Sequence, residues 1–145
     1  MNKDINVKLI ADVTLLYNGK VLLVKYKDSN KYDHQKGWFL PDDLIKENEK
    51  AEDSAFRILK EQLVIKEIIP LFLNHTESFR GNDNTRHEVS HFLSNLNVMP
   101  EINSTNDISE VKWFGINELP DKKEIAHHGW AKFTVDKVIS NLNKK

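Results

Sequence analysis

The 145-residue sequence contains no cysteine. This absence excludes disulfide bonds, thiolate zinc sites and a cysteine nucleophile. Neither charge is in excess, since the formal net charge is -1, so there is no electrostatic reason to expect non-specific binding to nucleic acid. No apolar run approaches the length of a membrane span, and the N-terminal residues MNKDINVK lack the apolar core of a signal peptide. We therefore expect a cytoplasmic protein that binds neither nucleic acid nor a membrane.

The residues that are present are typical of a soluble globular domain. Apolar residues make up 39% of the chain and charged residues 30%. A chain of this length can bury a proper core as one domain, and no internal repeat, low-complexity segment or linker divides it. We therefore expect a single domain over residues 1–145.

Hydrophobic periodicity predicts both strands and helices. Asn18-Gly19 is a strong β-hairpin signal between the first two strands, and Pro70 marks an edge or a bulge because it cannot donate to a ladder. Strands are predicted at residues 7–17, 21–27, 38–40, 87–96 and 110–114. Helices are predicted at 51–63 and 129–142. Polar loops are predicted at 28–36, from Pro41 to the first helix, and at 80–86.

The stretch from Gly37 to Ile65 carries the most informative pattern. Its predicted helix has one apolar stripe, formed by Ala51, Ala55, Ile58 or Leu59, and Leu63. Charged residues fill much of the remaining surface. Arg57 and Glu61 are four residues apart and therefore share a face of the helix.

This stretch resembles the Nudix box, the signature of the MutT-like Nudix hydrolase superfamily. The family pattern is glycine, five residues, glutamate, seven residues and then R-E-U-x-E-E-x-G-U, where U is a bulky aliphatic residue, and W-x-L-P-G usually precedes it. The matching residues are Trp38, Leu40, Pro41, Glu49, Arg57, Leu59, Glu61 and Ile65. The departures are Asp42, Asp43, Asn48 and Val64 at glycine positions, and Ile58 and Gln62 at glutamate positions. The box is therefore degenerate.

The resemblance extends beyond the box. A VLLV-like second strand, a late strand with Trp113 and the turn Glu118-Leu119-Pro120 occur where Nudix domains carry similar segments. The implied fold class is α/β, an α/β/α sandwich with a mixed β-sheet between helices. The implied activity is hydrolysis of a nucleoside diphosphate linked to another moiety, with Mg2+ or Mn2+ as cofactor.

The departures affect shape and chemistry differently. Aspartate and asparagine tolerate positive φ better than other non-glycine residues, so we expect the loop with Asp42, Asp43 and Asn48 to keep the family's shape. Val64 is β-branched and poorly suited to a left-handed helix terminator. We therefore expect the exit of this helix to differ from the family's.

The lost glutamates are chemical changes. The resemblance implies that the family's glutamates at 58, 61 and 62 hold divalent cations, which prefer oxygen ligands. Ile58 offers no ligand, Gln62 offers a neutral oxygen, and Glu61 is left alone. Because disturbing even an outer partner of a metal costs roughly 10–100-fold in affinity or activity, we expect weak or lost pyrophosphohydrolase activity.

Candidate site residues follow from these positions. The candidate catalytic residues are Glu61, Arg57 and Glu49, and the resemblance implies that Glu49 and Arg57 form a salt bridge that ties the loop to the helix. The candidate metal ligands are Glu61, Asp42 and Asp43, although turn formation alone also explains the two aspartates. The general base and the substrate-binding residues are not assigned.

Two functions are left open at this point. The first is a hydrolase that acts on a nucleotide-type small molecule with Mg2+ or Mn2+. The alternative is a non-catalytic domain that binds a nucleotide or a protein and needs no cofactor; a homodimer is left open in both cases. His87 and His91 lie on one face of a predicted strand, without an accompanying metal motif, and we expect packed or solvated histidines rather than zinc ligands.

Overall fold

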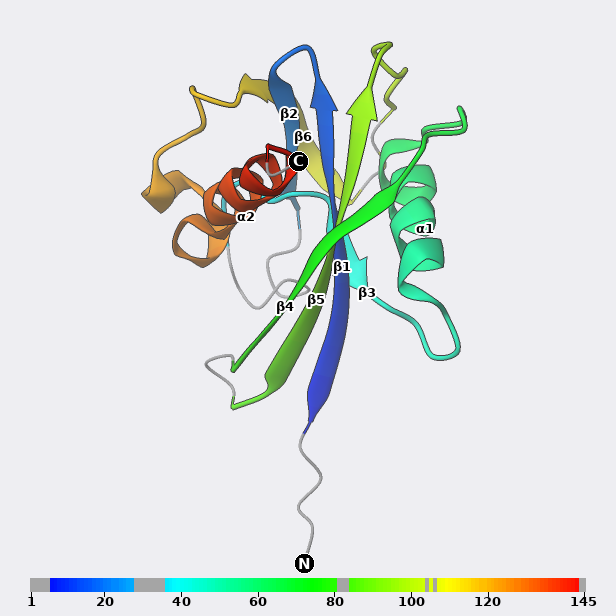
Figure 1. Ribbon diagram of the computed structural model, residues 1–145, viewed down its shortest axis with the longest axis vertical. Helices are drawn as coiled ribbons and strands as arrows, with labels where there is room; N and C mark the ends of the chain where they lie inside the picture. Colours follow the sequence, from blue (N-terminus) through cyan, green and yellow to red (C-terminus); the bar gives the residue numbers. More distant parts are fainter. Residues whose placement is uncertain (1–5, 28–35, 81–83, 104, 106, 144–145) are drawn as a thin grey trace, which may run out of the picture.

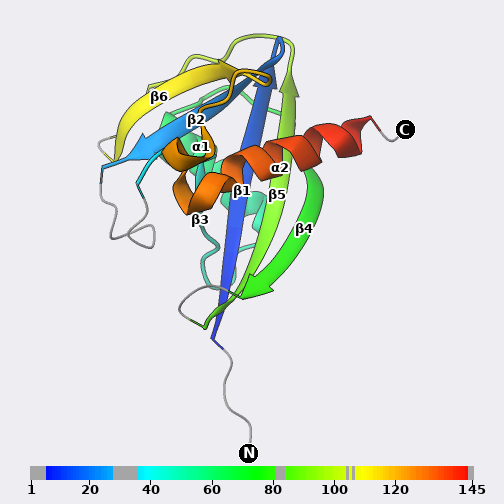
Figure 2. The ribbon, with the colours of Figure 1, turned by 90° about the vertical axis from the view of Figure 1, so that its left-hand side faces the viewer.

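The computed structural model describes residues 6–27, 36–80, 84–103, 105 and 107–143. These residues form a mixed six-stranded sheet in the order β4-β5-β1-β2-β6, and β3 pairs with β1 outside this path. Helix α1 covers one face of the sheet and helix α2 the other (Figures 1 and 2). The strands are β1 (Val7–Tyr17), β2 (Lys20–Tyr26), β3 (Asp42–Leu44), β4 (Phe72–Arg80), β5 (Arg86–Leu96) and β6 (Ile108–Gly115). The helices are α1 (Ala51–Leu63), the 3-10 turn η2 (Lys122–Glu124) and α2 (Ala126–Leu142). The predicted α/β/α sandwich with a mixed sheet is confirmed.

Strand β1 lies at the centre of the sheet. It runs parallel to β5 over its whole length, from the pair Val7–Arg86 to the pair Tyr17–Leu96. It turns back antiparallel into β2 through Asn18-Gly19, whose φ angles are 51° and 75°. Positive φ at both positions is what a tight hairpin of this type requires, and the predicted hairpin is confirmed.

Two hydrophobic cores fill the space on either side of the sheet. Neighbouring side chains of a strand point to opposite faces, so β1 supplies Ala11, Val13 and Leu15 to the core under α1 and Leu16 to the core under α2. Strand β5 divides in the same way, with Phe92 in the first core and Leu93 in the second. On α1 the predicted stripe is confirmed by the buried side chains of Ala55, Ile58, Leu59 and Leu63.

Helix α1 has the predicted bounds, but the expectation for its exit is wrong. Val64 adopts the left-handed conformation, with φ 52° and ψ 38°. The backbone N–H groups of Val64 and Ile65 both donate to the carbonyl oxygen of Leu59, as in a left-handed helix terminator. This conformation costs a residue with a Cβ atom roughly 1–2 kcal/mol. Burial of Leu63 and Ile65 on either side of Val64 holds the chain in it.

The loop before α1 also differs from its prediction. The segment that begins at Pro41 is not wholly a loop, because Asp42–Leu44 form β3 and pair with β1. Trp38 and Phe39, predicted as part of a strand, make only isolated bridges. The expectation that residues at the family's glycine positions take over positive φ holds at Asn48, whose φ is 66°, and is wrong at Asp42 and Asp43, which are strand residues without positive φ.

Strands β5 and β6 begin and end within two residues of their predicted limits, whereas β4 was not among the predicted strands. Pro70 precedes β4, an edge strand whose pairing is irregular between Leu73 and His75. Helix α2 starts three residues before the predicted Gly129, but His127, His128 and Gly129 all have positive φ, so its regular part begins at Trp130. Residues 28–35 and 81–83 of the two predicted loops lie outside the described residues. Within the described parts of the chain, no helix is both long and apolar enough to cross a membrane.

Candidate functional site

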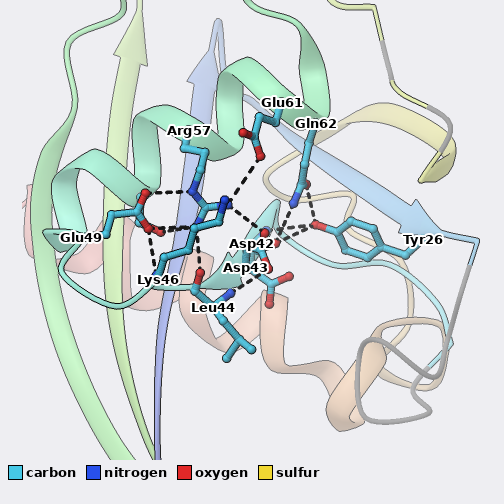
Figure 3. A network of polar contacts seen from close by, with 10 residues as sticks. Tyr26, Asp42, Asp43, Leu44, Lys46, Glu49, Arg57, Glu61 and Gln62 are labelled. Atoms are coloured by element: carbon cyan, nitrogen blue, oxygen red, sulfur yellow. Dashed lines mark hydrogen bonds and ion pairs between the residues drawn. The ribbon is translucent and has the colours of Figure 1, made fainter.

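The side chain of Arg57 joins α1 to the loop that precedes it (Figure 3). Its Nε and one terminal nitrogen donate to the two carboxylate oxygens of Glu49 at 2.9 and 3.0 Å. The other terminal nitrogen donates to the carboxylate of Asp43 at 3.0 Å, and the carbonyl oxygen of Leu44 accepts a further bond at 2.8 Å. The predicted salt bridge between Glu49 and Arg57 is confirmed, and Asp43 of β3 adds a second carboxylate.

This ion pair is largely shielded from solvent. The side chains of Arg57 and Glu49 are 12% and 16% exposed. Hydrogen bonds from Arg57 and from the backbone N–H of Lys46 lower the pKa of Glu49 to about 2. The hydrogen bond to Glu49 also raises the pKa of Arg57. A guanidinium that is bound to two carboxylates and a carbonyl has few donors left for a phosphate, so this geometry favours a positioning role for Arg57 and Glu49.

Gln62 connects α1 to β3 and to the end of β2. Its Nε2 donates to the carbonyl oxygen of Asp42 at 2.8 Å, and its Oε1 accepts a hydrogen bond from the hydroxyl of Tyr26 at 2.7 Å. The backbone N–H of Asp42 donates to the same hydroxyl at 3.0 Å. Both ends of the Gln62 carboxamide are therefore used inside the protein. A carboxylate at this position would lose the donated bond.

The other two positions that carry glutamate in the family, 58 and 61, differ in their exposure to solvent. Ile58 is 1% exposed and lies in the core under α1. The side chain of Glu61 is 59% exposed, with an oxygen 3.7 Å from a terminal nitrogen of Arg57. Of positions 58, 61 and 62, only 61 presents a carboxylate to solvent.

The chain matches a known protein family over most of its length. A model of the family described as NUDIX domain matches residues 8–133. This chain belongs to the Nudix family. The match runs from β1 into α2, so family membership rests on most of the chain and not on the box alone.

Solved Nudix structures share the fold at low sequence identity. A MutT NUDIX hydrolase from Burkholderia pseudomallei is 17% identical, with a TM-score of 0.74 over 92% of this chain and 98% of its own. An Ap4A hydrolase from C. elegans, solved as a binary complex, is 17% identical, with a TM-score of 0.69 over 95% and 98%. A MutT/nudix family protein from Enterococcus faecalis is 26% identical, with a TM-score of 0.64 over 79% of this chain and 46% of its own. No curated protein sequence matches the chain.

The residues of this Nudix box do not fit a cation held by several carboxylates. Adjacent residues of β3 point to opposite sides of the sheet, so Asp42 and Asp43 cannot both face Glu61. The Asp43 carboxylate is bound to Arg57, while Asp42 lies opposite Asp12 in the backbone register of β3 and β1. Among the residues that the structure describes, no group of three or more histidines, aspartates or glutamates is arranged to hold a metal ion.

A buried charged network outside the Nudix box was missed by the sequence analysis. His91 of β5 lies between two carboxylates: its Nδ1 is 2.8 and 2.9 Å from the oxygens of Asp12, and its Nε2 is 2.7 Å from an oxygen of Glu77. The side chains of Asp12 and His91 are fully buried. The available signal was Asp12 itself, a carboxylate inside an apolar strand, because a buried charge needs a partner. His87 is also buried and stacks on Phe79, as expected for a packed histidine.

Proposed function

We propose that this Nudix domain binds a nucleoside diphosphate linked to a second moiety and hydrolyses it weakly or not at all. The observation that carries the proposal is the use of positions 58 and 62 for structure: Ile58 is core, and Gln62 is hydrogen-bonded at both ends. Two structurally similar proteins are named as an Ap4A hydrolase and an ADP-ribose pyrophosphatase, which supports a nucleotide-type ligand.

Residual hydrolysis would depend on Glu61. It is the solvent-exposed carboxylate of the former cluster, and a single carboxylate together with substrate phosphates is a sufficient ligand set for Mg2+ or Mn2+ in some sites. Arg57 and Glu49 would then act by holding the loop, since their charged groups bind each other. In this proposal Asp42 and Asp43 have a structural role as residues of strand β3 and are not metal ligands.

Turnover and binding are tested separately on the same compounds. The purified protein is incubated with dinucleoside polyphosphates, nucleotide sugars and nucleoside triphosphates in the presence of Mn2+, and released phosphate or nucleotide is measured. The same compounds are screened for a rise in melting temperature. Stabilisation with little or no turnover supports the proposal, whereas fast turnover that Glu61→Gln abolishes would replace it with an active hydrolase. If no compound is turned over and no compound raises the melting temperature, nucleotide recognition is refuted.

Restoring the family's glutamates at positions 58 and 62 tests whether the scaffold has lost only its metal ligands. The double variant Ile58→Glu/Gln62→Glu restores the family pattern, and Mn2+ binding is measured by electron paramagnetic resonance. Lys60→Glu is the matched control, because it makes the same change in net charge at an exposed position of α1. Binding by the folded double variant alone supports loss of the ligands. Equally weak binding by both variants would count against the alignment of the box.

A further inference from the structure

A cavity of about 310 Å³ lies between β4 and α2, on the sheet face opposite α1. Its lining residues are His75, Thr76 and Glu77 of β4 and Trp130, Phe133, Thr134 and Lys137 of α2. Figure 2 shows α2 crossing the strands on this side. The volume is at the lower end of the range for small-molecule sites, and the lining combines aromatic rings with a few polar groups, as such sites do.

One wall of the cavity carries the carboxylate of Glu77, which a contact with His91 holds in place. His91 lies opposite Asp12 on β1 and opposite His75 on β4. Because both ring nitrogens of His91 face carboxylates, both donate, and the ring is an imidazolium held between Asp12 and Glu77. The Glu77 side chain is 39% exposed, whereas that of His91 is fully buried. The contact with the His91 imidazolium therefore orients the Glu77 carboxylate and keeps it ionised at the edge of the cavity.

The neighbouring rings provide flat surfaces and a second acceptor. His75 stacks on His91 with ring centroids 4.4 Å apart, and the Trp130 ring lies 5.8 Å from His91. The Asn74 side-chain oxygen accepts from Asn141 and lies 2.7 Å from Nδ1 of His75. Nδ1 of His75 therefore carries the hydrogen, and Nε2 is an acceptor. Burial lowers the pKa of His75, which keeps this ring neutral.

The mixed charges around the cavity disfavour a simple ion as its ligand. A cation would meet Lys137 in the lining and the ammonium of Lys122, which lies 5.0 Å above the Phe133 ring. An anion would meet the carboxylate of Glu77. A neutral, flat group that donates N–H hydrogen bonds satisfies both the aromatic surfaces and the acceptors.

We propose that this cavity receives the base of the nucleotide and selects bases that carry an exocyclic amino group, through Glu77 held in place by His91. This inference rests on the proposed function and specifies the class of nucleotide. An N–H group donated to an ionised carboxylate is worth about 1.5–3 kcal/mol. A base without the amino group should therefore bind roughly 10–100-fold more weakly.

Two pairs of nucleotides isolate the amino group. GMP and IMP differ only by its presence on the ring, and so do AMP and purine ribonucleoside monophosphate. Dissociation constants of all four are measured by calorimetry on the full chain. We expect the amino-bearing member of at least one pair to bind about 10-fold more tightly or better. Glu77→Gln should bring that ratio close to one, whereas Glu88→Gln on β5, outside this cavity, should leave it unchanged.

A fluorescence measurement makes the test independent of the stability of the Glu77 variant. A base in the cavity should quench the emission of Trp130, and Trp130→Phe should remove the quenched component. Nucleotides that bind with equal affinity within each pair, a preference that survives Glu77→Gln, or quenching that persists in Trp130→Phe would overturn the inference and leave the proposed function standing. Absence of binding by the monophosphates and by every diphosphate-linked compound would overturn both.

Discussion

Raising the pH from about 6.5 to above 9 should destabilise this protein through a single buried side chain, His91. Burial lowers the pKa of His91, but the hydrogen bonds to Asp12 and Glu77 together raise it to about 9, compared with 6.5 for an ordinary histidine. The folded protein therefore binds this proton more tightly than the unfolded chain. The resulting stability is fully present below pH 6.5 and is lost as the pH rises through about 9.

The size of the effect follows from the two pKa values. A rise from 6.5 to about 9 corresponds to about 3 kcal/mol of unfolding free energy. For a chain of 145 residues this is a fall of roughly 6–12 °C in melting temperature. Burial also raises the pKa of Asp12, which acts with the same sign wherever Asp12 titrates. Glu77, whose pKa the His91 hydrogen bond lowers, stays ionised across the range and adds no slope.

Urea unfolding at several pH values between 6 and 10 measures the loss directly. His91→Gln should be less stable than the parent at pH 6.5 and should lack most of the pH dependence. His128→Gln is the matched control, because His128 is exposed, and its profile should follow that of the parent. A parent profile that is flat from pH 6.5 to 9, or a slope that survives in His91→Gln, would refute the assignment of an imidazolium to His91.

Substitutions at three further positions test the architecture around the box. Val64→Gly should raise the unfolding free energy by up to about 1.6 kcal/mol, because it removes a left-handed penalty of roughly 1–2 kcal/mol and adds about 0.4–1 kcal/mol of conformational freedom to the unfolded chain. A variant that is less stable in urea titration contradicts this. Arg57→Ala should cost about 2–4 kcal/mol, because Glu49 and Asp43 lose their shared partner, and Arg57→Lys should recover only part of it in thermal unfolding. Gln62→Glu should cost about 1–3 kcal/mol in the same assay through the lost donated bond, and an unchanged melting temperature would count against that bond.

Local patterns in the sequence determined helix α1, the first hairpin and strands β5 and β6, together with the salt bridge of the box. The helix from Ala51 to Leu63 was predicted to the residue, because a stripe at steps of three and four can be buried only by an α-helix. The hairpin at Asn18-Gly19 follows from the conformations that those two residues adopt. The family pattern predicted the Glu49–Arg57 salt bridge, because it places Glu49 in the loop and Arg57 on the helix that follows.

Tertiary structure alone decided the features that depend on distant segments. Pairing with β1 makes Asp42–Leu44 a strand, so the side chains of Asp42 and Asp43 point to opposite sides of the sheet. No local pattern in the sequence indicates this. Burial of its neighbours held Val64 in a conformation that valine disfavours when considered alone. The network of Asp12, Glu77 and His91 joins three strands, so neither its charge nor the cavity beside it exists before the sheet forms. Periodicity encodes which face of an element is buried, whereas the partner that each buried polar group meets depends on contacts between residues far apart in the chain.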